Sequence, residues 1–441
     1  MSESAGRAEI ERSVSDALAR EPIVDMHTHL YPPSFGTPTP GRSRQAPDPR
    51  GLMRWGIDDL LTYHYLTAEV FRVVPASRLP YEQYWRMTKR QQADHIWKHL
   101  FVERAPLSEA CRGILTTVQR LGLDPSDPTP DRWREFTDQQ DPNEYVDTVM
   151  EIAGVRLITM TNNVFDDDER TRWLADPSLG NDPRFRAVLR IDPLLASWPA
   201  AASKLSAWGF PADEDASNGA IENVKRFLHE WIDRMGAIYL AASLPPEWRY
   251  PATDGDSLAR LGSTILQQAV LPVCEERNLP FAMMIGATRR ANPLLREAGD
   301  MMGNADVTSV VNLCRDFGRN RFLVTMLSRE NQHELAVASR KFGNLMPFGC
   351  WWFVNNPSLI DEITRMRVEL LGTSFIPQHS DARVLEQLIY KWDHSRQVLA
   401  RVLTEKFDAI AQTGRRVTSE EITRTIRLML SGTFEQFRTG G

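Results

Sequence analysis

The feature that most constrains the fold is a repeated alternation of short apolar segments with longer helical patterns. The short segments are rich in aliphatic and aromatic residues and are typical of buried strands. Eight of them can be placed, at 21–26, 155–160, 185–191, 236–242, 280–286, 321–327, 345–350 and 373–378. Alternating strands and helices build a parallel sheet, and eight strand–helix units are what a closed barrel requires. We therefore expect an α/β fold, a (β/α)8 TIM barrel, as one domain over residues 1–441.

One interval breaks this rhythm. About 130 residues separate the first two expected strands, and they carry helical patterns at 56–72, 80–101, 107–121 and 143–153. A barrel loop needs only a few residues. The sequence therefore predicts an inserted helical subdomain over 56–154, which forms a wall or cap at the catalytic end of strand 1. Elsewhere, helices are expected at 221–235 and 358–370, and the proline-rich stretch 32–49 predicts a loop.

Charge and composition restrict the partners. The net charge is −6, from 52 basic and 58 acidic residues, and there is no basic tail, which argues against nucleic acid and anionic membranes. No run of 18 apolar residues predicts a membrane span. The beginning of the chain lacks secretory-signal features, and the four cysteines form no CxxC pair. We expect a cytoplasmic protein that acts on a small molecule, with homo-oligomerisation left open.

Two histidines give the sharpest chemical signal. His27 and His29 stand at the end of the first expected strand, in IVDMHTHL. Alternate residues of a strand point to the same side, so both imidazoles project from one face at the barrel mouth. Borderline divalent metals such as Zn²⁺ favour such ligands. The alternative is a structural or surface histidine pair.

The segment IVDMHTHL resembles the strand-1 signature of the amidohydrolase superfamily. Further segments resemble, in the same order, those of the uronate isomerases: LTYHYLTAEVFR, IWKHL, MIGATRRAN, SRENQHEL, FGCWWF and SDAR. The series runs from about residue 20 to 430. The resemblance implies an aldose–ketose isomerase that acts on a hexuronate or a related carboxylate-bearing sugar acid.

The same resemblance implies a mononuclear metal site. Its ligands would be His27, His29 and Asp381, the last at the end of strand 8, with zinc as the first expectation and manganese or iron as alternatives. Two imidazoles and a carboxylate leave coordination positions open, as catalysis requires. Strands 4 to 6 lack the additional ligands of two-metal relatives. A solvated or helix-capping aspartate is the alternative for Asp381.

The resemblance to the uronate isomerases also implies further site residues. His64 and Tyr65 match the family's acid/base pair, although a His-Tyr pair in a helix more often serves packing. Arg383 suits bidentate carboxylate recognition, with a structural ion pair as the alternative. Trp351 and Arg289 match pocket residues that bind substrate, although a Trp-Trp pair more often belongs to the core or to a wall.

Several positions depart from the family pattern. Met284 replaces a histidine, Asn162 and Asn163 replace two carboxylates, and Ala241 stands where strand 4 usually ends in polar groups. A pocket that has lost these groups suits a substrate with fewer hydroxyls, because each buried hydroxyl needs a partner.

A new histidine appears beside the expected carboxylate ligand. His379 lies two residues before Asp381 and should point the same way. It can act as a replacement acid/base or an additional ligand, or it can be a satisfied barrel residue. The alternative functions are a metal-dependent hydrolase or lyase acting on a less hydroxylated carboxylate, with Asp381 as base, and a catalytically silent barrel that binds a ligand.

Overall fold

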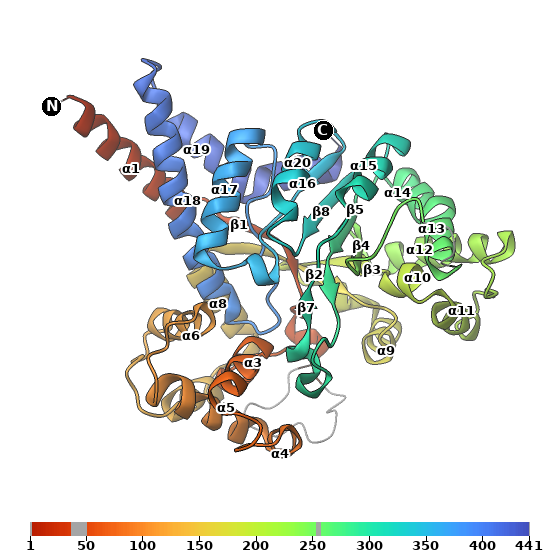
Figure 1. Cartoon of the computed structure of the whole chain (residues 1–441), viewed down its shortest axis with the longest axis horizontal. Helices are drawn as coiled ribbons and strands as arrows, with labels where there is room; N and C mark the ends of the chain where they lie inside the picture. The colour runs from red at the N-terminus through yellow and green to blue at the C-terminus, as the bar shows by residue number, and fades with distance from the viewer. Residues whose placement is uncertain (1, 37–50, 253–256, 441) are drawn as a thin grey trace.

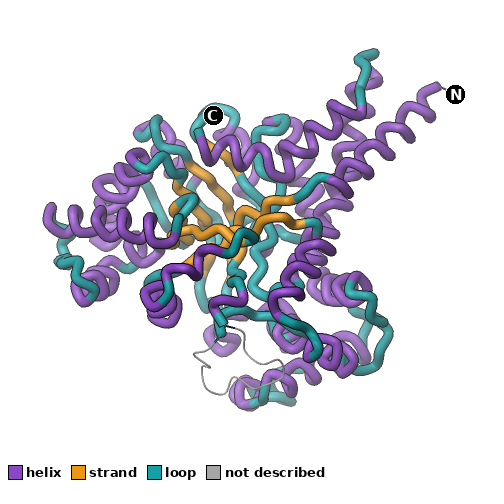
Figure 2. Tube along the Cα trace, turned by 180° about the vertical axis from the view of Figure 1, so that it is seen from behind, coloured by secondary structure: helices purple, strands orange, loops and turns teal. Residues whose placement is uncertain are grey.

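The computed structural model describes residues 2–36, 51–252 and 257–440. A parallel sheet lies at its centre with helices packed around it (Figures 1 and 2). The sheet has seven strands in the order β1-β2-β3-β4-β5-β8-β9. They are β1 (Ile23–Thr28), β2 (Val155–Asn162), β3 (Phe185–Arg190), β4 (Leu240–Leu244), β5 (Phe281–Ile285), β8 (Phe322–Met326) and β9 (Leu345–Pro347). The first seven expected strands all overlap these elements. Most of the expected loop at 32–49 lies outside the described residues.

The expected eighth strand, 373–378, is not a regular strand. Ile376 forms a single parallel bridge with Phe348, and its amide donates to the Pro347 carbonyl at 3.0 Å. A few residues later the same segment reaches the opposite edge strand, where the Asp381 amide donates to the His27 carbonyl at 3.1 Å. Residues 376–382 therefore bond to both β9 and β1, without forming a continuous ladder.

The sheet is apolar on both faces, as parallel sheets usually are. Ala282 and Met284 of β5 belong to a cluster inside the curled sheet, whereas Met283 and Ile285 belong to the larger core shared with the surrounding helices. This alternation follows from the two-residue period of a strand. The inner cluster forms the floor beneath the ends of the strands.

Helices before and after the strands cover the outer face. They are α1 (Ser2–Arg20), α9 (Asp167–Ala175), α10 (Asp192–Ala196), α11 (Trp198–Ala207), α12 (Asn218–Met235), α13 (Ser257–Ile265), α14 (Leu271–Glu276), α15 (Val307–Asp316), α16 (Asn331–Ser339), α17 (Pro357–Leu371), α18 (Gln387–Gln412), α19 (Ser419–Arg427) and α20 (Thr433–Thr439). The expected helices at 221–235 and 358–370 correspond to α12 and α17. Within the described ranges, no helix has both the length and the apolar character needed to cross a bilayer.

Among the described residues, seven α-helices lie between β1 and β2. They are α2 (Ile57–Leu61), α3 (His64–Val73), α4 (Tyr81–Arg86), α5 (Lys89–Trp97), α6 (Glu109–Arg120), α7 (Asp131–Asp138) and α8 (Pro142–Ala153). The expected helices 56–72 and 80–101 are each broken in two, and α7 was not expected. Most of these helices share a hydrophobic cluster of their own, which includes Tyr84, Trp97 and Val118. In Figure 1, α3, α4, α5 and α6 lie together below the sheet.

A small hairpin also approaches these helices. Its strands are β6 (Ala287–Thr288) and β7 (Met301–Met302), which pair antiparallel. The Trp85 indole of α4 donates to the Leu294 carbonyl in the connecting loop at 2.9 Å. The Arg296 guanidinium lies 4.6 Å from the centre of the Trp85 ring. These contacts hold the hairpin loop against the helices that follow β1.

Candidate metal and substrate site

The structure brings together the three expected ligands. His27 and His29 end β1, and Asp381 follows the bridge segment. The Nε2 atoms of His27 and His29 lie 3.4 and 3.3 Å from the same oxygen, Oδ1 of Asp381. One ligand atom from each residue can be chosen so that all three lie within 4.8 Å of one another. His27 and Asp381 are buried, and His29 borders a cavity.

Asp381 is held in place by an unusual backbone and by a buried neighbour. Its φ of +52° lies in the left-handed region, which few non-glycine residues adopt. Asp25 of β1 accepts hydrogen bonds from the Ser380 amide at 3.1 Å and from the Trp392 indole at 2.9 Å. Because these bonds fix the chain just before Asp381, they compensate for the strain of the turn.

Thr161 of β2 determines the tautomer of His29. The Thr161 hydroxyl donates to the Thr28 carbonyl at 2.8 Å and lies 3.1 Å from Nδ1 of His29. A hydroxyl has one hydrogen, so it must accept from Nδ1. His29 therefore carries its hydrogen on Nδ1, and its Nε2 lone pair faces the Asp381 carboxylate.

This arrangement fits a cation. Among the described residues, His27 Nε2 and Asp381 Oδ1 are buried without a hydrogen-bond partner. A lone pair facing a carboxylate is repulsive unless a positive charge lies between them. Two imidazole nitrogens and a carboxylate oxygen are a donor set that Zn²⁺ and related ions accept.

His379 lies beside the triad. It is fully buried, its ring centre is 5.3 Å from that of His27, and neither ring nitrogen has a partner in the described part of the chain. Burial holds the pKa of His379 well below its usual value, so the ring is neutral. Gly349 makes room for it, because a Cβ there would lie 1.8 Å from Nδ1 of His379.

His64 and Tyr65 begin α3, and His64 borders a cavity together with Arg383. Neither His64 Nε2 nor the Tyr65 hydroxyl has a hydrogen-bond partner in the described ranges, and both atoms are buried. The His64 ring lies 5.2 Å from that of Trp352. Burial lowers the pKa of His64 and raises that of Tyr65, so His64 is neutral and Tyr65 keeps its proton.

Three arginines, Arg54, Arg190 and Arg383, border the cavity that His29 faces. Arg383 lies 3.6 Å from the exposed carboxylate of Glu297, in the hairpin loop. Arg190 makes two hydrogen bonds of 2.8 Å to Asp192. This cavity has a volume of about 360 Å³ and is lined by His29, Arg190 and Arg383 among others. Arg190 was missed in the sequence, where its only signal is a position at the end of the third strand.

The other expected substrate residues differ in placement. Arg289 donates to Asp300 at 2.6 Å and borders a cavity with His64, Trp352 and Arg383. Trp351 is buried in the cluster inside the sheet. Its neighbour Trp352 lines the cavity that Arg289 borders, and it also lines a separate cavity beside Tyr65.

The four positions that depart from the family pattern also lie near the site. Met284 and Ala241 belong to the apolar cluster inside the sheet. The side-chain amide of Asn162 is buried without a partner among the described residues. Asn163 lines the cavity that holds His29. The floor of the site is therefore less polar than the sites that the family pattern describes.

Comparison with known proteins agrees with this geometry. No protein-family model and no curated protein matches the chain. Among solved structures it resembles a uronate isomerase from Bacillus halodurans, with 48% identity, 98% of this chain and 96% of that chain covered, and a TM-score of 0.90. A uronate isomerase from Thermotoga maritima shares 15% identity over 97% of both chains (TM-score 0.76). A glucuronate isomerase from Caulobacter crescentus shares 16% identity over 98% of this chain and 94% of that one (TM-score 0.75). The last two show the fold, and the first shows that this chain belongs to the uronate isomerase family.

Proposed function

We propose that this protein is a mononuclear, metal-dependent aldose–ketose isomerase that acts on a hexuronate or a related carboxylate-bearing sugar acid. The convergence of His27, His29 and Asp381 beside Arg383 carries the proposal. This group combines a cation site with a carboxylate-binding side chain, as a small sugar acid requires. The 48% identity to a solved uronate isomerase supports the same reaction class.

His27, His29 and Asp381 would hold one divalent ion, zinc first, with manganese or iron as alternatives. When bound, such an ion supplies positive charge to substrate oxygens that become negative during the reaction. Thr161 orients His29, and Asp25 fixes the turn that carries Asp381. These supporting contacts keep the ligands in place before the substrate arrives.

Arg383 and Arg190 would bind the substrate carboxylate. Both border the same cavity as His29, and a guanidinium can donate two parallel hydrogen bonds to a carboxylate. The ion pair of Arg383 with Glu297 is long, at 3.6 Å, so the substrate can compete for it. Arg289 and Trp352 would line the remaining wall, and Trp351 would support Trp352 from the core.

Isomerisation moves one proton from C2 to C1 of the open-chain sugar and another between the two oxygens. His64 is neutral because burial lowers its pKa, so it can accept a proton. Tyr65 keeps its proton because burial raises its pKa, so it can donate one. His379 and Asp381 are further proton-accepting groups, with His379 in place of the family's strand-5 histidine. Such transfers need these atoms within hydrogen-bond distance of the substrate.

The fold supports this arrangement. We propose that residues 376–382 take the place of the eighth strand and close the barrel, because they form hydrogen bonds to both β9 and β1. Residues 1–441 would then form one domain. Residues 56–154 would be an inserted helical subdomain. It contributes His64 and Tyr65 and forms a wall of the site.

The test is an NMR assay of the purified protein with glucuronate and with galacturonate. The wild type should convert at least one of them to the ketose, whereas His27→Ala should be inactive and lose bound metal. His333→Ala, which changes an exposed histidine of α16, is the matched control. If both sugars stay untouched while His27→Ala still loses metal, the alternative is a metal-dependent hydrolase or lyase acting on a less hydroxylated carboxylate. The apolar Met284 and Ala241 favour that candidate.

A further inference from the structure

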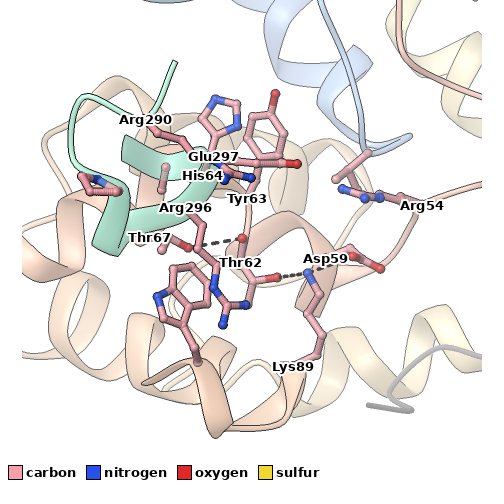
Figure 3. Close-up of a pocket in the computed structure, with 14 residues that line it drawn as sticks. Arg54, Asp59, Thr62, Tyr63, His64, Thr67, Lys89, Arg290, Arg296 and Glu297 are labelled. Atoms are coloured by element: carbon pink, nitrogen blue, oxygen red, sulfur yellow. Dashed lines mark hydrogen bonds and ion pairs between the residues drawn. The ribbon is translucent and has the colours of Figure 1, made fainter. Parts of the chain in front are cut away.

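A further chamber shares lining residues with the cavity beside His29. Its volume is about 480 Å³, and its walls include Arg54, Tyr63, His64, Lys89, Arg290 and Arg296 (Figure 3). We call it the outer chamber, and the cavity beside His29 the inner cavity. Both volumes lie within the range of small-molecule pockets, roughly 300–1,000 Å³. Arg54 and Glu297 line both, so the two spaces share a wall.

The outer chamber favours anions. Its lining contains four basic side chains, Arg54, Lys89, Arg290 and Arg296, and two acidic ones, Asp59 and Glu297. Lys89 lies 3.2 Å from Asp59 and also donates to the Thr62 hydroxyl at 2.8 Å. The excess of positive charge in a concave site attracts negative ligands.

Buried polar atoms on the wall of the outer chamber indicate a hydroxyl-bearing ligand. The Tyr63 side chain is 7% exposed, and its hydroxyl is buried without a partner in the part of the chain that the structure describes. His64 Nε2 is also buried and has no hydrogen-bond partner among the described residues. His64 borders the cavity that Arg383 lines as well. A buried polar group without a hydrogen bond is costly, and ligand hydroxyls in the outer chamber can satisfy these atoms.

The walls of the outer chamber are held by contacts between distant segments. Arg296 lies over the Trp85 ring at 4.6 Å, and the Trp85 indole donates to the Leu294 carbonyl. Figure 3 shows Arg290 and Glu297 on the wall formed by the hairpin loop, opposite Lys89 and Asp59 on the helices. The cationic groups therefore face the chamber from two sides.

We propose that the outer chamber binds the second sugar-acid unit of an acidic disaccharide whose reducing-end uronate occupies the metal site. This inference rests on the proposed function and extends its substrate class. One hexuronate can occupy the inner cavity, which leaves the outer chamber for a unit linked on the non-reducing side. A disaccharide linked in this way keeps the free aldehyde that isomerisation needs. The arginines would bind its second carboxylate.

The test compares digalacturonate with galacturonate on the metal-loaded enzyme, by calorimetric Kd and by NMR kcat/KM. Wild type should bind the disaccharide about tenfold more tightly, the effect expected of one hydrogen bond to a charged group. Arg296→Gln should lower the disaccharide-to-monosaccharide ratio about tenfold. Arg329→Gln, at an exposed arginine that pairs with Glu362, should leave that ratio unchanged.

The outcomes separate this inference from the proposed function. If neither sugar is isomerised but digalacturonate binds more tightly and Arg296→Gln removes the preference, the chamber assignment stands and the isomerase assignment fails. If galacturonate is isomerised while digalacturonate binds no better, the chamber assignment is wrong. An unchanged ratio in Arg296→Gln, with an unchanged thermal midpoint, also overturns it. Absence of binding by either sugar overturns both.

Discussion

The Thr161 hydroxyl on β2 accepts a hydrogen bond from Nδ1 of His29 on β1, at 3.1 Å. Because the same hydroxyl donates to the Thr28 carbonyl at 2.8 Å, it cannot also donate to the imidazole. The Nε2 lone pair of His29 therefore points to the space between His27, His29 and Asp381, where the metal ion would lie. Such partners of a ligand histidine fix its ring and its tautomer.

We predict that Thr161→Val weakens metal binding by about 10- to 100-fold, the usual effect of losing such a partner. The ring of His29 would be free to rotate and to place its hydrogen on Nε2. Metal retained per chain, measured after dialysis against graded chelator concentrations, checks this result.

Thr159→Val is the matched control on the same strand. The Thr159 hydroxyl is buried but has no hydrogen-bond partner among the described residues. This variant should retain metal like the wild type. Equal metal loss in both variants would show that the effect comes from the strand and not from the bond to His29.

A second prediction concerns the space around His379. Gly349→Ala would place a Cβ 1.8 Å from Nδ1 of His379 at a backbone φ of +63°. The left-handed backbone costs about 1–2 kcal/mol, and overpacking adds about 1–3 kcal/mol. We expect lower stability together with a loss of kcat, because His379 must move.

Gly236→Ala measures the loss of stability that the left-handed backbone causes without the steric clash. Gly236 has a similar φ of +59°, and no described atom lies within 4 Å of its Cβ position. This variant should lose about 1 kcal/mol of stability and keep its kcat. Urea unfolding and steady-state kinetics measure the two effects. If Gly349→Ala matches Gly236→Ala in both, the assigned place of His379 is wrong.

The third prediction is a pH effect on stability. Burial raises the pKa of Glu386 from 4.5 to about 7, and its carboxylate accepts a hydrogen bond from the Gly56 amide at 2.6 Å. Between these two pKa values the folded protein binds more protons at this site than the unfolded chain. Stability from this group is therefore lost as the pH rises from about 4.5 to 7, by about 3 kcal/mol.

Glu386→Gln removes this titration and keeps an oxygen that can accept from Gly56. Measured by urea unfolding, the variant should gain about 3 kcal/mol relative to wild type between pH 4 and pH 8. Other titrating groups contribute equally to both proteins and cancel in the comparison. A constant difference over this range would show that Glu386 has an ordinary pKa.

Much of the fold was predictable because its strands are short, apolar and regularly spaced. The segment 373–378 was expected to be a strand for the same reason, yet it forms only one bridge. The cause is not visible locally, because the left-handed turn at Asp381 depends on the distant Asp25 side chain. The β6–β7 hairpin was missed because two residues per strand give no alternation to detect.

The site was predictable only in part. His27, His29 and Asp381 were found from a local motif and from resemblance, and the structure places them around one point. Arg190 and Thr161 were missed because an arginine or a threonine at the end of a strand is common. The roles of these two residues depend on neighbours that other strands bring beside them. Trp352 stands next to Trp351, which was chosen, and only the folded backbone shows that Trp352 is the one that lines a cavity. Tyr63 lines the same chamber as its chosen neighbour His64.

The most direct test of the central claim is stepwise reconstitution of metal-stripped enzyme, followed by the rate of uronate isomerisation at each step. Stripped protein should be inactive, and activity should rise with added Zn²⁺, Mn²⁺ or Fe²⁺ until about one ion is bound per chain, while His27→Ala stays inactive throughout. Full activity in the stripped protein, or a rise that continues to two ions per chain, would contradict a single metal held by His27, His29 and Asp381.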